Sequence, residues 1–163
     1  MYELKYEIIF TAGYPQIFSD RLIRSATCGA FGSHPSLLPK YKGLGPIFQA
    51  LLHNENEIGF SFHYIDEDVD TGEIIKRQKI KTEKNESVSH IAIRAHVVAG
   101  YELLSILNNL KKGDKKTEQI TQDNGNYFSW PEKKDVKKFM QSNKKYVEFR
   151  DFLSLVFYNP KKF

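Results

Sequence analysis

An apolar run that ends at a proline is the feature that most constrains this chain of 163 residues. The residues from Cys28 to Ser33 read CGAFGS and lead directly into His34-Pro35. Proline lacks a backbone N–H, so it cannot continue the ladder of hydrogen bonds inside a sheet. We therefore expect a strand that ends at His34. A histidine at the carboxyl end of a strand lies where α/β sheets present reactive groups to a ligand.

Two elements are predicted before this run. Tyr6 to Thr11 (YEIIFT) is rich in residues that favour β-structure and is followed by Ala12-Gly13, which is typical of a buried strand of a parallel sheet. Asp20 to Ala26 predicts a short helix behind that strand. The chain therefore opens with a βα unit, and the predicted fold class is α/β.

A helix and two further strands are predicted after the proline turn. Pro46 suits the first turn of a helix whose apolar residues continue to Leu52. Ile58 to Tyr64 alternates apolar residues with small or polar ones, and Glu73 to Ile80 is another extended segment. The sequence DEDVDTG lies between the two segments, so the predicted strands flank an acidic loop.

The longest predicted helix follows the second of these strands. The run Asn85-Glu86-Ser87 offers capping residues, apolar residues recur at helical spacing as far as Leu110, and Gly113 marks the end. Gly100, inside the helix, indicates a point of close packing against a neighbour.

The carboxyl-terminal part differs in composition. Asn124-Gly125 between two β-capable stretches predicts a hairpin, and Pro131 to Met140 predicts a last short helix. From Lys133 to Phe163 there are nine Lys/Arg against three Asp/Glu. We interpret this charge as a solvated, lysine-rich surface and not as a nucleic-acid platform. We divide the chain into an α/β portion, residues 1–112, and a basic extension, residues 113–163.

Cysteine content and hydropathy limit the class of protein further. The single cysteine, Cys28, excludes an internal disulfide and any multi-cysteine metal site. The amino-terminal residues MYELKYEIIF carry Glu3, Lys5 and Glu7 and so form no uninterrupted apolar segment. No later stretch approaches the roughly 20 apolar residues of a membrane span. We expect a cytoplasmic protein without a membrane partner.

The loop that begins at His34 carries a resemblance to a known family. The sequence HPSLLPKYKG, His34 to Gly43, is similar to the signature loop of the folate-dependent formyltransferases, His-Pro-Ser-Leu-Leu-Pro-x-Tyr-Arg/Lys-Gly. In the same register, AGYPQIF resembles their folate-side loop, GPIFQALL their next helix, and FHYIDEDVDTGEII the loop that holds their catalytic aspartate. The resemblance runs without a gap from about Ile8 to Leu110, and the tail GNYFSWPEKKDV resembles a short hairpin and helix found in several branches.

The resemblance implies a fold as well as an activity. The expected fold is a partial Rossmann-like domain, a mostly parallel sheet flanked by helices, followed by a short hairpin and helix. In the family, the first βαβ units precede the strand that matches Tyr6 to Thr11. The resemblance therefore implies that the chain starts partway through the domain. A second copy of the chain or a separate amino-terminal half is the expected means of completing it.

The chemistry implied is transfer of a formyl group from 10-formyltetrahydrofolate to an amine. Such a transfer needs the amine held against the formyl carbon, a donor for the oxyanion and a base for the amine's proton. By resemblance, His34 polarises the formyl oxygen or relays a proton, and Asp70 orients that histidine or accepts the proton. Gly32 stands where the family has an oxyanion-donating asparagine, and glycine has no side chain to donate from.

The resemblance also implies the residues that bind the two substrates. The backbone of the acidic loop is expected to hold the pterin ring. No metal is expected, because Asp66, Asp68 and Asp70 lack the glycine and glutamate that an EF-hand loop places after its aspartates. The folate-binding candidates are Tyr14, Gln16, Ile17, Phe18, His63, Ile65, Asp66, Glu67 and Asp68. The acceptor-binding candidates are Pro35, Ser36, Tyr41, Lys42 and Gly43.

The acceptor remains open at this level. The tail favours an amine on a nucleotide-linked sugar or a similar small metabolite, and glycinamide ribonucleotide is an alternative. Methionyl-tRNA is disfavoured, because the residues after Leu110 are too few for the extra domain of its formyltransferases. Two other classes stay open: a catalytically silent relative that binds folate or a partner subunit, and a basic RNA-interaction module.

Overall fold

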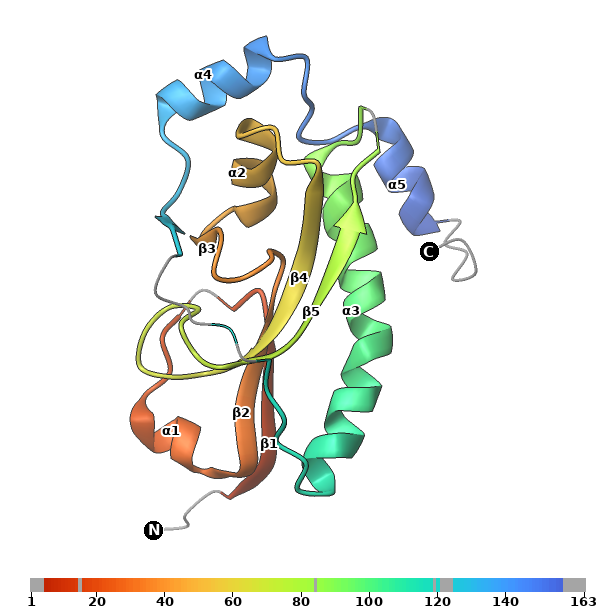
Figure 1. Ribbon diagram of the computed structural model, residues 1–163. Coiled ribbons are helices and arrows are strands. Elements are labelled where there is room, and N and C mark those ends of the chain that lie inside the picture. The colour runs from red at the N-terminus through yellow and green to blue at the C-terminus, as the bar shows by residue number, and fades with distance from the viewer. Residues whose placement is uncertain (1–4, 15, 84, 119, 121–124, 157–163) are drawn as a thin grey trace.

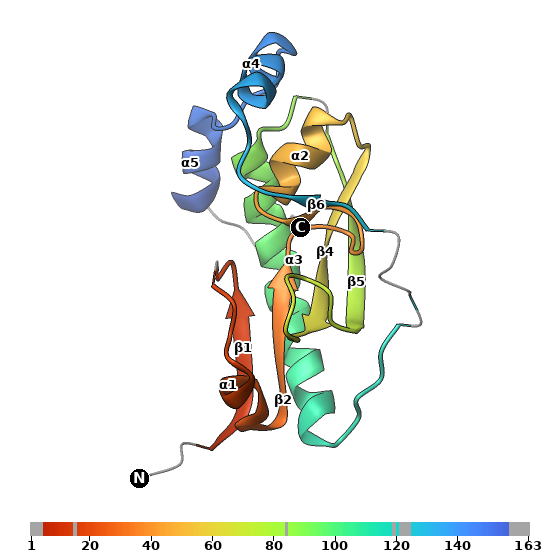
Figure 2. The same ribbon diagram turned by 90° about the vertical axis from the view of Figure 1, so that its left-hand side faces the viewer.

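A four-stranded sheet forms the centre of the computed structural model, which describes residues 5–14, 16–83, 85–118, 120 and 125–156 (Figure 1). Its strands, in spatial order, are β1 (Tyr6–Ala12), β2 (Ala26–His34), β4 (Glu57–Tyr64) and β5 (Ile74–Lys81). β1 runs parallel to β2, whereas the β2–β4 and β4–β5 pairs are antiparallel. The sheet is therefore mixed, where we expected mostly parallel pairs. Figure 2 shows β1 at one edge, half-buried to exposed where we expected a buried strand.

The two faces of the sheet have different roles, because successive side chains in a strand point to opposite faces. One face carries Phe31 and Phe62, which pack with Phe60 and with the buried residues Ala95 and Ile106 of the long helix. Phe10 extends this aromatic layer onto β1, with its ring centroid 5.1 Å from that of Phe31. The other face carries the polar residues discussed below. Figure 1 shows the long helix on one side of the sheet and the β4–β5 loop on the other.

Three helices follow from the local sequence. α1 (Asp20–Arg24) begins after Ser19, α2 (Pro46–Leu52) has its proline in the first turn, and α3 (Val88–Lys111) begins after Ser87. The Ser87 hydroxyl accepts a hydrogen bond from the backbone N–H of His90 at 3.0 Å, as an N-cap residue does. Every residue of α2 is buried. This helix forms the centre of a second hydrophobic core, which lies between the sheet and the carboxyl-terminal segment.

α3 departs from expectation at one position. A methyl group built on Gly100 would meet nothing within 4 Å, and the residue is exposed. The predicted close packing at Gly100 is therefore wrong. Among the described residues, α3 is the one helix long and apolar enough to cross a membrane by length and composition alone. The core helix of a globular domain passes the same test, and Ile91, Ala95 and Ile106 of α3 are all buried against the sheet and its neighbours.

The carboxyl-terminal segment returns to the sheet. β6 (Tyr127–Phe128) pairs in parallel with β3 (Lys42–Gly43), so it joins the loop after β2. Asn124 of the predicted turn and most of the stretch before it lie outside the described residues, so the predicted hairpin stays a prediction. The predicted short helix is present as α4 (Lys133–Gln141), and Phe139 packs on Phe48 of α2 with ring centroids 4.6 Å apart. A further helix, α5 (Phe149–Val156), was not predicted.

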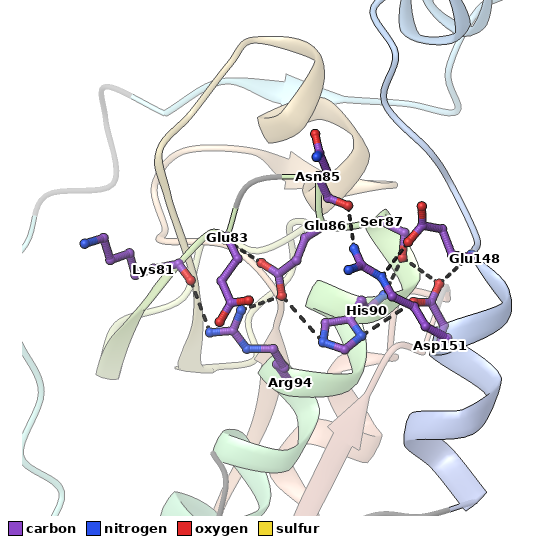
Figure 3. A network of polar contacts seen from close by, with 10 residues as sticks. Lys81, Glu83, Asn85, Glu86, Ser87, His90, Arg94, Glu148 and Asp151 are labelled. Atoms are coloured by element: carbon purple, nitrogen blue, oxygen red, sulfur yellow. Dashed lines mark hydrogen bonds and ion pairs between the residues drawn. The ribbon is translucent and has the colours of Figure 1, made fainter.

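Buried polar contacts hold α5 against the start of α3 (Figure 3). The Ser87 hydroxyl donates to Oδ2 of Asp151 at 2.6 Å, and both residues are almost fully buried. The ring of His90 lies between Asp151, 3.5 Å from its Nδ1, and Glu86, 3.7 Å from its Nε2. Arg94 donates to the carbonyl oxygen of Lys81 at 3.1 Å, which ties the same network to the end of β5.

Candidate active site

A cavity of about 300 Å³ opens on the polar face of the sheet, at the carboxyl ends of β1 and β2. The loop after β1, the start of the HPSLLPKYKG loop and the β4–β5 loop form its walls, and Tyr127 of β6 contributes from the carboxyl-terminal segment. This is the edge at which α/β sheets bind ligands. The predicted position of His34 at the end of β2 is confirmed, and His34 lines the cavity.

Three residues on adjacent strands form the floor of the cavity. Thr11 of β1 pairs with Gly32 of β2, and Gly32 pairs with His63 of β4. Residues paired across neighbouring strands share a face, and all three line the cavity. A Cβ at position 32 would lie 3.0 Å from Oγ1 of Thr11 and 3.7 Å from Nε2 of His63. The glycine therefore leaves space that the side chains of its two neighbours border.

Asp70 lies above this floor and contacts two histidines. Its Oδ2 is 3.3 Å from Nδ1 of His34, and its Oδ1 is 3.4 Å from Nε2 of His63. The backbone N–H of Gly43 also donates to Oδ2 at 2.8 Å. Asp70 has a φ of 56°, in the left-handed region, so the tight turn of the β4–β5 loop aims its carboxylate back at the strand ends. The predicted juxtaposition of His34 and Asp70 is present, and His63 joins it.

The surroundings of Asp70 favour its charged form. Burial alone raises the pKa of a carboxyl group. Here the contacts with His63 and His34, together with the Gly43 N–H, outweigh burial and hold the pKa of Asp70 below its ordinary value of 3.8. Asp70 is therefore a carboxylate at neutral pH.

His34 is held at both ring nitrogens. Its Nε2 donates to the carbonyl oxygen of Tyr41 at 2.8 Å, and its Nδ1 faces Asp70. The residue is only 6% exposed, and this burial lowers the pKa of His34 below the ordinary 6.5 despite the nearby carboxylate. Neutral His34 thus carries its proton on Nε2, which leaves the lone pair of Nδ1 free to accept one. A proton accepted there is stabilised by Asp70.

Hydrogen bonds to other segments of the chain hold the HPSLLPKYKG loop in place. The Ser61 hydroxyl donates to the carbonyl oxygen of Ser36 at 2.8 Å and accepts from the N–H of Leu38 at 3.0 Å. Asn126, in the carboxyl-terminal segment, accepts from the N–H of Tyr41 at 2.6 Å through its side-chain oxygen. These contacts set the position of the Tyr41 carbonyl and therefore that of the His34 ring.

One wall of the cavity is apolar and aromatic. The rings of Tyr14 and Phe18 are stacked, with centroids 5.0 Å apart and planes inclined by 7°. Ile17, beside them, is 67% exposed, and Ile65 and Val69 lie across the cavity on the β4–β5 loop. A flat ring system bordered by polar edges fits such a wall, since apolar sides contact its faces and the loop backbone is within reach of its edge.

Most of the predicted site residues lie at the cavity, but not all. The predicted folate-side residues that line it are Tyr14, Gln16, Ile17, Phe18, His63, Ile65, Asp66 and Asp68; Glu67 is not among them. Of the predicted acceptor residues, Pro35 and Gly43 line it. Ser36 instead donates to the carbonyl oxygen of Lys40, and the Tyr41 ring stacks on Phe128. Lys42 lies in β3 and is nearly buried.

The sequence did not single out several residues that line the cavity. Thr11 ends the predicted first strand. The alternation of side chains along that strand, together with the observed register of β1 against β2, places it beside Gly32. Tyr127 is far from the other residues in sequence, and only the β3–β6 pairing brings it to the cavity.

Comparison with known proteins gives a consistent result. The family model described as formyl transferase matches residues 1–107. A methionyl-tRNA formyltransferase from Staphylococcus aureus is 34% identical over 121 residues, which are 74% of this chain but only 38% of that protein. The chain thus spans well under half the length of the curated relatives it matches.

Solved structures show the same likeness. The formyltransferase PseJ from Anoxybacillus kamchatkensis, in complex with a UDP-linked formamido sugar and tetrahydrofolate, superposes with a TM-score of 0.69 at 25% identity, covering 83% of this chain and 69% of PseJ. An N-formyltransferase from Helicobacter canadensis, in complex with folinic acid and dTDP-3-aminofucose, superposes with a TM-score of 0.66 at 26% identity, covering 79% of this chain and 47% of that one.

Proposed function

The chain belongs to the formyltransferase family, and we propose that it transfers a formyl group from 10-formyltetrahydrofolate to an amine of a small metabolite, a nucleotide-linked amino sugar. The observation that carries the proposal is the carboxylate of Asp70 set between His34 and His63 at the end of a ligand-sized cavity. The folate and amino-sugar ligands of the PseJ and Helicobacter canadensis structures support the choice of donor and acceptor.

The cavity suits a reduced folate. Its volume of about 300 Å³ is at the lower end of the range for small-molecule sites. Tyr14, Ile17 and Phe18 would contact the ring faces on one side, and the backbone of the loop from Ile65 to Asp70 would face the polar edge of the pterin. When bound, the folate supplies the formyl group as an activated amide.

The acceptor amine approaches from the side of the HPSLLPKYKG loop. Pro35, Gly43 and Tyr127 line this part of the cavity. A bond forms between the amine nitrogen and the formyl carbon, and the carbonyl electron pair moves onto the formyl oxygen. The pair returns as the bond to the folate nitrogen breaks. The proton lost by the amine is balanced by the one that the folate nitrogen gains.

His34 and Asp70 handle that proton. The Nδ1 lone pair of neutral His34 accepts it, and the Asp70 carboxylate, 3.3 Å away, stabilises the imidazolium that results. The Nε2–H bond to Tyr41 keeps the ring from rotating. Holding the amine against the formyl carbon supplies much of the remaining rate enhancement.

The test uses the purified full chain with 10-formyltetrahydrofolate and two amines, a UDP-linked 4-amino sugar and dTDP-3-aminofucose. We expect a formamide product by mass spectrometry with at least one of them. Asp70→Asn, which keeps the shape and removes the charge, should lower kcat by about a hundredfold or more. Asp135→Asn, on the exposed helix α4, is the matched control. Transfer that survives both Asp70→Asn and His34→Ala would refute the assignment.

Gly32 favours a second candidate function, a silent folate-binding relative, because no side chain at this position donates to an oxyanion. Calorimetric titration with tetrahydrofolate separates the two. Folate binding without product from any amine supports the silent relative. Salt-sensitive RNA binding in the absence of folate binding would instead support the basic RNA-interaction module.

A further inference from the structure

Formyl transfer requires a hydrogen-bond donor to the formyl oxygen, and the residues described above do not supply one. Formyl transfer places negative charge on the formyl oxygen, and removal of one oxyanion donor costs about 10² to 10³ in rate. Gly32 has no side chain. The one N–H of neutral His34 is donated to the Tyr41 carbonyl, and its Nδ1, which faces Asp70, has no hydrogen to donate. The donor must therefore come from another residue on the floor of the cavity.

His63 is in the required place. It is the cross-strand partner of Gly32, and its Nε2 lies 3.7 Å from the point where a Cβ on residue 32 would be. The imidazole therefore borders the space that a side chain at position 32 would enter. It lines the cavity together with Gly32 and His34. A larger residue at position 32 would stand between this ring and the cavity.

The contacts of His63 place an acceptor against each ring nitrogen. Nδ1 lies 2.9 Å from the carbonyl oxygen of Tyr64, and Nε2 lies 3.4 Å from Oδ1 of Asp70. Both of these oxygens only accept hydrogen bonds. A hydrogen on Nε2 therefore points at Asp70. At 3.4 Å the Nε2 contact is long for a hydrogen bond, so this N–H can move to a stronger acceptor at little cost.

We propose that His63, held in place by Asp70, donates from Nε2 to the formyl oxygen while negative charge develops on that oxygen. The inference rests on the proposed function and adds a catalytic residue to that site. One carboxylate then serves two histidines with different roles. His34 accepts the amine's proton, and His63 stabilises the oxygen. The residue at position 32 is small because the donor comes from the neighbouring strand.

Kinetics of the full chain give the first test. His63→Ala lowers kcat by about 10² to 10³ while the KM values for donor and acceptor change little, since the contact forms only as charge develops. His63→Gln, which restores an N–H donor, recovers part of that loss. His96→Ala, on the exposed surface of α3, is the matched control and leaves kcat unchanged. A kcat within about threefold of wild type for His63→Ala overturns the proposal.

A spectroscopic test does not depend on turnover. The five histidines are labelled with ¹⁵N, and the His63 signals are assigned from their loss in His63→Gln. We expect the signal of an N–H on Nε2 of His63. We also expect a larger shift of its Nε2 on addition of 10-formyltetrahydrofolate than on addition of tetrahydrofolate, which lacks the formyl oxygen.

The outcomes separate the two levels of inference. If neither folate moves any histidine signal, the proposed function fails, and this inference fails with it. If both folates bind but shift His63 equally, or if Nε2 of His63 carries no hydrogen, the proposed function stands and the role of His63 is overturned. A formyl-specific shift of His63 together with the loss in kcat supports both.

Discussion

His34 and Asp70 link the chemistry of the site to the stability of the fold. The pKa values of both residues lie below their ordinary values, chiefly through burial for His34 and through the contacts with His63 and His34 for Asp70. In both cases the unfolded chain binds more protons than the folded one at acid pH. Stability therefore falls as the pH falls. For His34 the loss begins near 6.5, and for Asp70 it begins near 3.8.

This sign gives a prediction for His34. Between pH 7 and pH 5, the free energy of unfolding of wild type should decrease more steeply than that of His34→Gln, which cannot take up the proton. Urea denaturation at half-unit steps of pH measures the two slopes, and their difference removes the contribution of the other histidines. Equal slopes would show that His34 titrates alike in the folded and unfolded chain.

Gly32 and Thr11 supply a second residue-scale prediction. A Cβ at position 32 would lie 3.0 Å from the Thr11 hydroxyl oxygen, which is closer than ordinary contact. Gly32→Ala should lower the free energy of unfolding by about 1 kcal/mol through overpacking. Thr11→Ala removes the opposing atom, so the double variant should be more stable than the sum of the single effects. Additive effects in urea denaturation would contradict the close contact.

At the scale of elements, what could be predicted from the sequence depended on whether the signal was local. The strand that ends at His34-Pro35, the proline start of α2 and the Ser87 cap of α3 were all predicted, because each rests on neighbouring residues. The pairing of β6 with β3 was missed, since Asn124-Gly125 indicated a local hairpin and the partner strand is more than eighty residues away. Gly100 was misjudged because glycine in a helix need not mark a contact.

The attachment of α5 to α3 can be tested at Ser87. Its hydroxyl both caps α3 and donates to the buried carboxylate of Asp151. Ser87→Ala loses the cap and leaves that carboxylate with fewer donors, so the free energy of unfolding should fall by about 2 kcal/mol. Ser89→Ala, two residues along the same helix and partly exposed, is the control and should change stability by less than about 0.5 kcal/mol. Thermal and urea denaturation measure both variants, and similar losses would exclude a specific role for Ser87.

At the scale of the whole molecule, the cavity combines segments from both parts into which the sequence was divided. The floor and the two histidines come from the first 112 residues, whereas Tyr127 lines the cavity from beyond them. The sequence could predict His34 and Asp70 as a pair because the resemblance covers both motifs. It could not predict that Asp70 also contacts His63, because that depends on the register of β4 against β2 and on the positive φ of Asp70.

Asn126 makes the dependence on the carboxyl-terminal segment testable. Its side-chain oxygen accepts from the N–H of Tyr41 at 2.6 Å, and the carbonyl of the same Tyr41 accepts from Nε2 of His34 at 2.8 Å. Asn126→Ala removes the first contact and lets the loop relax, so the His34 ring loses its fixed orientation. We expect kcat for formyl transfer to fall by about tenfold, with the affinity for tetrahydrofolate nearly unchanged, because the aromatic wall lies elsewhere.

The control for Asn126→Ala is Asn108→Ala, an exposed position on α3 remote from the cavity, which should leave kcat at the wild-type value. Asn126→Asp is the sharper second variant. It keeps the acceptor oxygen for the Tyr41 N–H, and it should therefore retain more activity than Asn126→Ala even though it adds a charge. Steady-state kinetics measure kcat for each variant, and calorimetric titration measures its affinity for tetrahydrofolate. If Asn126→Ala and Asn108→Ala have the same kcat, the carboxyl-terminal segment covers the site without positioning it. The contacts from Asn126 through Tyr41 to His34 then contribute nothing to catalysis.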